Sequence, residues 1–219
     1  MIRPLLLSFS ILLLVTGCGA TAAKTPVSPQ LQTAIATSDP LAIADALEAL
    51  IDEGKATEHD RQVAYETLRD AQMPTAQYAF ARAMVTGRLA QVKGLAGAML
   101  AREMESWAET ARKLDSAFRD GGATRMLGTL YVLAPSSVLA HGDSEKGLEM
   151  LEKNRKDYPN AIENHLRYAE ALIALNDAGS ATEALCKCRA EKAKLRKDDQ
   201  ALLDKLFQDA GSPTCPAAP

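Results

Sequence analysis

Residues 125–172 read RMLGTLYVLAPSSVLAHGDSEKGLEMLEKNRKDYPNAIENHLRYAEAL, and this stretch decides the fold. Its first part carries a Leu-Gly-x-x-Tyr motif at 127–131, a spacing typical of one side of a helix. Pro135 then interrupts the helical pattern, because the residue before a proline is biased away from helical geometry. Asp143 is a suitable N-cap for a second helix. The stretch therefore predicts a hairpin of two helices whose connection is longer than a tight turn.

The spacing within these helices matches a tetratricopeptide unit, which repeats every 34 residues. Gly147, Asn154 and Pro159 occupy positions of the second helix at the correct mutual spacings, after an insertion between the two halves. A further unit follows in register, without an insertion, from His165 to Cys188. Each hairpin leaves one apolar face that only a neighbouring hairpin can cover, so the units must stack. We predict an all-α, tetratricopeptide-like repeat solenoid with an inserted loop.

Helix signals extend this pattern over residues 38–211. Asp39-Pro40 is a helix start with proline at the first helical position, and Gly54 ends that element. Pro74 opens a later helix, and residues 88–114 are predicted to form a bent or broken helix pair. The segment 197–211 is predicted to be a C-terminal capping helix that turns its charged face to solvent. The charged residues of that face are Lys197, Asp198, Asp204 and Lys205.

The first residues have the pattern of an export signal. Residues 1–17 combine Arg3 with an apolar run that is too short for a transmembrane helix, which needs about 20 residues. The sequence Val-Thr-Gly-Cys at 15–18 resembles the lipobox of bacterial lipoproteins, in which the cysteine is lipidated. An ordinary signal peptide or a buried apolar helix is the alternative. We expect Cys18 to anchor the protein on the periplasmic face of a bacterial membrane, with Gly19 favouring the outer membrane.

The segment behind the lipidated cysteine is predicted to lack structure. Residues 18–37 are rich in small residues and include prolines, a composition that favours a flexible tether. The repeat domain is predicted to follow over 38–211, and residues 212–219 form a short tail.

The charge balance disfavours nucleic acid as a partner. The formal net charge is −3, whereas nucleic-acid-binding domains usually carry a basic stripe. Aromatic residues make up only 5% of the chain, too few for a platform on which bases stack.

The cysteines agree with export to an oxidising compartment. Once Cys18 is lipidated, Cys186, Cys188 and Cys215 remain, and one disulfide plus a free thiol is the simplest account. Cys186 and Cys188 stand two apart on a predicted helix and point in different directions, so Cys215 should pair with one of them. Cys188 occupies a small core position, whereas Cys186 should be more exposed. The Cys-x-Cys pair lacks a convergent second pair, so we expect no metal site.

No catalytic constellation is present in the sequence. The three histidines, His59, His141 and His165, belong to no metal-protease motif, and the chain has neither a nucleophile elbow nor a phosphate-binding glycine loop. We therefore expect a binding protein without a cofactor, and not an enzyme.

The inserted loop and its flanks resemble the T component family associated with tripartite ATP-independent periplasmic (TRAP) transporters. That resemblance covers about 50 residues well and implies a lipid-anchored helical-repeat protein. Its implied partner is the periplasmic solute-binding protein or the ligand. Two positions depart from the family pattern, with Gly147 and Asn154 where alanine is usual, and the loop lacks the second proline that commonly follows Ala-Pro. The matching residues are Arg125, Leu127, Gly128, Leu130, Tyr131, Ala134, Pro135, Gly142, Asp143, Leu151, Glu152, Lys153, Pro159, Asn164, Leu166, Ala169 and Glu170.

The candidate binding site is the mouth between the helices of 122–134 and 160–175. We expect the loop from Pro135 to Gly142 to fold across this mouth. Structural roles compete for each candidate side chain: Arg125, for example, could instead pair with Glu170 or Asp143. The candidate residues for ligand or partner binding are Arg125, Tyr131, Pro135, His141, Asn164 and His165.

Two classes of function fit these observations. The first is a transport accessory that binds a small organic ligand, a periplasmic solute-binding protein, or both. The second is a cell-envelope scaffold that binds proteins through its repeat surface and takes no small ligand. The inserted loop favours the first class, and a homo-oligomer is compatible with either.

Overall fold

The computed structural model describes residues 26–71 and 73–216, so the predicted signal sequence and Cys18, the predicted lipidation site, lie outside the described residues. Within these ranges the regular structure is helical, without strands, and the all-α prediction is confirmed. The helices are α1 (Pro29–Ala36), α2 (Pro40–Asp52), α3 (Glu58–Ala71), α4 (Ala76–Ala90), α5 (Gly97–Leu114), α6 (Phe118–Leu133), α7 (Ser144–Asp157), α8 (Ile162–Ala174), α9 (Thr182–Ala190) and α10 (Lys197–Asp209), with 3-10 turns at Gly94–Ala96 and Lys192–Lys194.

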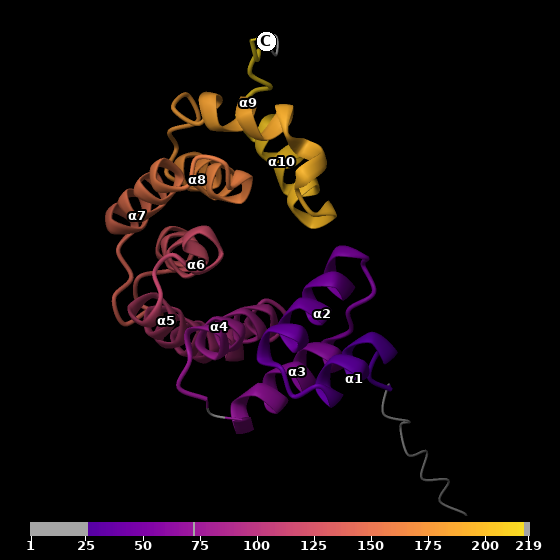
Figure 1. The fold of residues 1–219 in the computed structure, drawn as a ribbon. Helices are drawn as coiled ribbons and strands as arrows, with labels where there is room; N and C mark the ends of the chain where they lie inside the picture. The colour runs from indigo at the N-terminus through magenta and orange to yellow at the C-terminus, as the bar shows by residue number, and fades with distance from the viewer. Residues whose placement is uncertain (1–25, 72, 217–219) are drawn as a thin grey trace, which may run out of the picture.

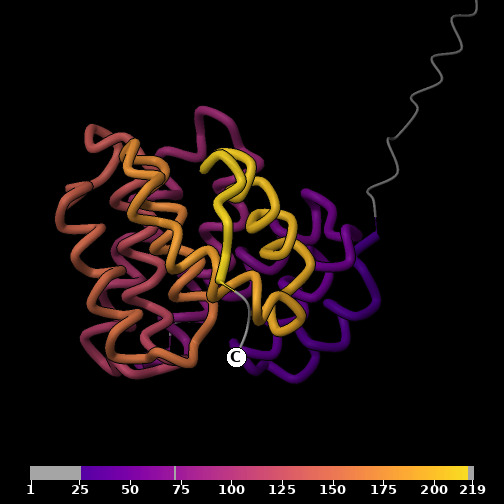
Figure 2. Tube along the Cα trace, turned by 90° about the horizontal axis from the view of Figure 1, so that it is seen from above, coloured from indigo at the N-terminus to yellow at the C-terminus, as the bar shows by residue number. Residues whose placement is uncertain are grey.

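The helices follow one another around a ring (Figure 1). Each helix contacts the next along the chain, and α10 also contacts α2, so the last helix meets the N-terminal part of the protein. Figure 2, turned by 90°, shows the indigo N-terminal helices and the yellow C-terminal helix on the same side of the molecule. The ring surrounds an open cavity that is lined by helices from both ends of the described chain, including α2 and α10.

Capping residues start the helices where the sequence predicts. The Asp39 carboxylate accepts a hydrogen bond from the Leu41 N–H, with Pro40 as the first helical residue. Asp143 accepts from the N–H groups of Glu145 and Lys146 and so begins α7. These side chains satisfy N–H groups that a helix start leaves without a partner.

The prediction of a flexible tether over 18–37 is wrong for residues 29–36, which form α1. Leu31 is fully buried, and Ala34 is buried beside it. The buried Asp60 carboxylate at the start of α3 fastens the entry to this helix, since it accepts hydrogen bonds from both the N–H and the hydroxyl of Ser28. Proline at the first helical position suits a helix start, and the apolar side of α1 then packs on α2 and α3.

The hydrophobic core is divided into layers that follow the ring. The first layer is formed by α1, α2, α3 and α4. The middle layers are formed by α4, α5, α6, α7 and the inserted loop, and the last layer by α8, α9 and α10. Each layer is shared by successive hairpins, so removal of one hairpin would expose the apolar face of the next. The largest fully buried side chains include Leu31, Leu47, Leu68, Tyr78, Leu127, Leu151, Leu166, Leu185 and Leu203.

Two glycines set the close packing of α6 on α7. A Cβ atom on Gly128 would lie 2.9 Å from the Gly147 carbonyl oxygen, and one on Gly147 would lie 2.8 Å from the Gly128 carbonyl oxygen. Any side chain at either position would push the backbones apart. Glycine at 147, where the resembled family usually has alanine, is thus explained by this contact.

The C-terminal helix does not end the stack as an isolated cap. Its first N–H groups, from Lys197 and Asp198, donate to the Asp52 carboxylate of α2. Arg196 and Arg88 both bind Glu48 of α2. Lys197, Asp204 and Lys205 are exposed, as predicted for the charged face. Asp198 is half-buried instead, because its carboxylate binds Arg88 and Arg196 beside α2.

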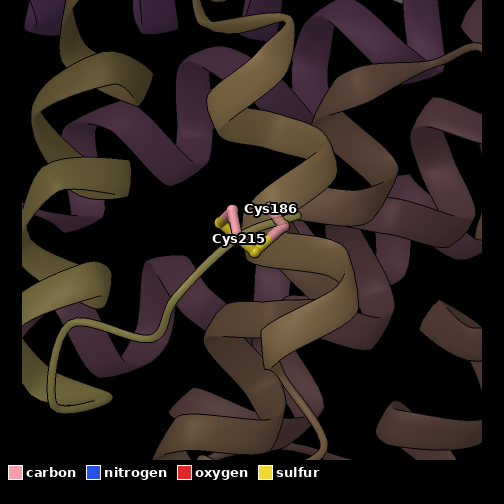
Figure 3. The surroundings of a disulfide bond; sticks show 2 residues. All are labelled: Cys186 and Cys215. Carbon is pink, nitrogen blue, oxygen red and sulfur yellow. A yellow bond between two sulfur atoms is a disulfide. The ribbon is translucent and has the colours of Figure 1, made fainter. Parts of the chain in front are cut away.

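A disulfide joins Cys186 of α9 to Cys215 of the tail (Figure 3). Of the two pairings left open by the sequence, the structure has this one, and Cys188 is a free, fully buried thiol. Burial raises the pKa of Cys188 to about 12, so its thiol stays protonated and unreactive at neutral pH.

Candidate functional site

The central space of the ring holds an open cavity of about 1090 Å³. Helices α2, α4, α5, α6 and α8 line it, together with the start of the inserted loop and the N-terminal end of α10. Its volume is slightly above the range for small-molecule pockets, which is roughly 300–1,000 Å³. Apolar lining comes from alanine, methionine and leucine side chains such as Met84, Met104, Met126 and Leu130.

Five arginines line this cavity, and four of them are neutralised by carboxylates. Arg119 binds Asp45 with two hydrogen bonds of 2.8 and 2.6 Å. The other three are paired as follows: Arg88 and Arg196 with Glu48, and Arg167 with Glu170 and Asp199. Their positive charge is therefore largely committed to the fold.

Arg125 is the exception among the cavity arginines. None of the carboxylates in the described part of the chain lies within 4.0 Å of its guanidinium. Its one hydrogen bond there joins Nη1 to the Asn164 Oδ1 atom at 2.6 Å. Burial lowers the pKa of Arg125 below its usual range, which means that the charged form lacks full compensation. An arginine has five N–H donors, so most of its capacity is available to a ligand.

A kink at the start of α6 holds Arg125 in place. Residues 119–121 adopt left-handed backbone angles, and a Cβ atom on Gly121 would collide with the Asn154 side chain at 1.9 Å. The exposed Asp120 carbonyl accepts a hydrogen bond from the Asn164 amide at 3.0 Å, and the Asn154 amide donates to Asn164 Oδ1 at 2.9 Å. Asn164 is thus fixed from two sides, which orients Arg125 without neutralising it.

A second polar group on the same face of α6 lacks a partner. Thr129 stands one turn after Arg125 and lines the cavity. Its hydroxyl is buried, and it makes no hydrogen bond with any described residue. A buried hydroxyl without a partner costs about 1–3 kcal/mol, so a ligand acceptor or donor here would be stabilised.

The structure separates the residues that the sequence grouped at one mouth. Arg125 and Pro135 line the cavity, and Asn164 lies directly behind Arg125. His165 does not line it: the ring is buried, and Nε2 lies 3.0 Å from the Pro159 carbonyl oxygen. Burial lowers the pKa of His165, which favours its neutral form and a packing role.

The alternative salt bridges considered for Arg125 are both absent from the described residues. Glu170 binds Arg167 at 2.9 Å instead, and Asp143 serves as the N-cap of α7. Because both carboxylates are engaged elsewhere, Arg125 keeps a free charge that the sequence pattern did not reveal.

The inserted loop does not fold across the mouth between α6 and α8, contrary to the prediction. It turns back onto α5, where Arg102 donates to the carbonyls of Ser137 and Val138. The loop is held there by Leu139, which is buried in the core layer beneath it, and by Glu105. Only its first residues, up to Val138, reach the cavity.

Tyr131 and His141 meet at a second location outside the cavity lining. The Tyr131 hydroxyl lies 3.3 Å from Glu109, and His141 Nδ1 lies 3.4 Å from Glu105 and 3.5 Å from Glu109. Burial, followed by the charges of Glu105 and Glu109, raises the pKa of Tyr131 above its usual value, so its hydroxyl stays protonated. These residues form a polar cluster between α5, α6 and the loop.

Sequence reasoning missed Thr129, Glu105 and Glu109. Thr129 could have been found from its place one turn after Arg125. Glu105 and Glu109 stand one turn apart on a helix, which is usual for solvated carboxylates and carries no signal by itself.

Comparison with known proteins finds no match to any protein-family model and no matching curated protein. Within residues 26–71 and 73–216, every helix falls short of the length and apolar character needed to cross a membrane.

Proposed function

We propose that this protein is a binding module whose central cavity takes a small organic ligand with a carboxylate and an apolar body. The observation that carries the proposal is Arg125, a half-buried cavity arginine that has no carboxylate partner among the described residues. Guanidinium and carboxylate groups form strong bidentate hydrogen bonds, so an organic acid would complete this site. Thr129 would add a hydrogen bond, and methionine and leucine side chains would contact the apolar part.

The cellular role that we propose is an accessory of a TRAP-type transport system. The resemblance of residues 125–172 supports this role, and the Cys186–Cys215 disulfide fits an oxidising compartment such as the periplasm. In this proposal the helical hairpins are tetratricopeptide-like units, supported by the contact of Gly128 with Gly147, and Cys18 carries the lipid anchor. The solute-binding protein would be its partner.

A protein-binding scaffold is the second candidate. One observation favours it: the turn between α4 and α5 exposes Leu95 completely and Met99 by 75%. Such side chains are typical of contact surfaces when they lie together. This role requires no ligand in the cavity.

Binding of carboxylates to the purified full-length protein tests the proposal. Isothermal titration with a panel of short and medium-chain organic acids, each compared with its uncharged amide, should give binding for at least one acid and none for its amide. Replacement of Arg125 by Gln should weaken that binding by about 10- to 150-fold, the effect of losing about 1.5–3 kcal/mol from hydrogen bonds to a charged group. Arg125→Lys keeps the charge but not the bidentate geometry, so its affinity for the acid should lie between those of the wild type and Arg125→Gln.

The matched control is Arg69→Gln, which removes an exposed arginine paired with Asp70 outside the cavity. This variant should bind as the wild type does. If the Arg125→Gln variant is folded by circular dichroism and binds with unchanged affinity, the cavity assignment is wrong. If no acid binds while a partner protein is captured stoichiometrically, the scaffold is the better account.

A further inference from the structure

The polar cluster between α5 and the inserted loop has the composition of a metal site. Glu105 and Glu109 stand one turn apart on α5, and the loop brings His141 against both. The three ligand atoms, two carboxylate oxygens and an imidazole nitrogen, all lie within 4.8 Å of one another. Carboxylate and imidazole ligands in this combination suit divalent transition metals such as zinc.

The two separations that involve His141 match those of ligands around one ion. Zinc bonds to nitrogen and oxygen are about 2.0–2.1 Å long, so neighbouring ligands in a tetrahedral site lie about 3.4 Å apart. His141 Nδ1 lies 3.4 Å from the Glu105 oxygen and 3.5 Å from the Glu109 oxygen. Both distances exceed those of ordinary hydrogen bonds between such groups, which are about 2.7–3.2 Å. An ion bound between them would explain why His141 Nδ1 lies close to both glutamate oxygens but too far for a direct hydrogen bond.

The local charge also favours a cation. Glu105 is only 2% exposed, and each of its oxygens accepts one backbone N–H, from Ala140 and His141, at 2.7 and 2.8 Å. Within the described ranges no lysine or arginine pairs with it. Among the described lysines and arginines, Glu109 contacts only the exposed Lys113, at 3.9 Å. Two carboxylates thus share a small volume with incomplete compensation.

The surroundings resemble the outer shell of a metal site. The two backbone N–H bonds fix the Glu105 carboxylate and leave lone pairs on both of its oxygens for an ion. The Tyr131 hydroxyl, 3.3 Å from Glu109, would orient the second carboxylate. Hydrogen-bonding partners of this kind position ligands and tune metal affinity.

We propose that Glu105, Glu109 and His141 bind one divalent transition-metal ion, with zinc as the best fit. His141 is 57% exposed, so the ion would be reached from solvent, and water would fill the fourth position. The ion would fasten the inserted loop to α5. Since Pro135 and Val138 at the other end of the same loop line the cavity, the metal would also stiffen one wall of that cavity.

The test uses the full-length protein after removal of metal with a chelator and exchange into chelator-free buffer. Titration with zinc should show one site, and thermal unfolding should shift to higher temperature with added zinc. Cobalt, used as a spectroscopic substitute, should give the intense visible absorption of a four-coordinate site. Magnesium, which prefers six oxygen ligands, should produce none of these changes.

His141→Ala and Glu109→Gln should each weaken zinc binding by at least tenfold and remove the cobalt absorption. Tyr131→Phe, which removes only the outer hydrogen bond, should weaken binding by about tenfold. His59→Ala is the matched control, because this histidine lies outside the cluster, and it should bind zinc as the wild type does.

Glu105→Gln is avoided as the deciding variant, since loss of the buried charge could unfold the loop. If folded wild-type protein binds no zinc, or if His141→Ala binds it with the affinity of His59→Ala, the proposal is overturned.

Discussion

Replacement of Glu48 by Gln should open the seam that closes the ring. Glu48 lies on α2 and binds Arg88 of α4 with two hydrogen bonds of 2.6 Å, and it also binds Arg196 at the entry to α10. Glutamine keeps one acceptor oxygen but places an N–H₂ group against a guanidinium and removes the negative charge. The variant would therefore leave two arginines facing each other with less compensation.

The expected loss of stability follows from the burial of the three groups. Removing one partner of a buried ion pair costs about 3–5 kcal/mol. The Glu48 and Arg88 side chains are 10% and 18% exposed, but Arg196 is 36% exposed and in part screened by water. We therefore expect the lower limit, about 3 kcal/mol, which corresponds to a fall in melting temperature of about 6–12 °C for a chain of this size.

The pH dependence of this loss has a defined sign. Burial alone would raise the pKa of Glu48, but Arg88 and Arg196 outweigh it and hold the pKa below its usual value. A depressed pKa in the folded state stabilises the protein above the unfolded pKa of about 4.3, and the stabilisation disappears as the pH falls through the folded pKa. The difference between wild type and variant should be full at pH 7 and shrink below about pH 4.

Urea denaturation followed by circular dichroism measures the global effect, and hydrogen exchange of the first amides of α10 measures the local one. Glu53→Gln is the matched control, because Glu53 is an exposed neighbour that binds only Lys55. It should change the free energy of unfolding by less than about 0.5 kcal/mol. The reasoning is refuted if the Glu48 and Glu53 variants have the same stability and the same exchange at α10.

Two further predictions concern the ends of the chain. Leu31→Ala should lower the free energy of unfolding by about 2–5 kcal/mol in urea denaturation, because Leu31 is fully buried. The control Leu95→Ala, at a fully exposed position, should have no effect. If the two variants are equally stable, residues 29–36 are a tether and do not pack as α1. Cys215→Ser should cost about 3.6 kcal/mol, from the entropy of a loop that links residues 29 apart. Reductant should lower the free energy of unfolding of the wild type by the same amount and leave that of the variant unchanged. If reductant does not affect the wild type, the Cys186–Cys215 disulfide is contradicted.

The sequence identified the local structure well, because helix starts and buried stripes depend on residues a few positions apart. Asp39 and Asp143 were recognisable as caps. The tether was misjudged for a related reason: residues 29–36 form a helix too short to be stable alone, and its order comes from packing on α2 and α3.

The candidate site was only partly accessible to such reasoning. Arg125 lines the cavity, but the compensation of its charge depends on which carboxylates are engaged by other arginines. The loop was expected across the mouth between the helices of 122–134 and 160–175, whereas the burial of Leu139 and the bonds to Glu105 hold it on α5. Neither fact can be read from the spacing within one repeat.

The sequence by itself determined that the described chain is helical and where helices such as α2 and α7 begin. The tertiary structure alone decided that the ring closes, that Arg125 meets no carboxylate among the described residues, and that His141 meets two glutamates. The physical reason is the separation along the sequence of the residues that interact. Caps and stripes arise from neighbours within two turns, whereas the bond between Arg196 and Glu48 joins residues 148 positions apart. Such a contact depends on the curvature accumulated over every hairpin between them.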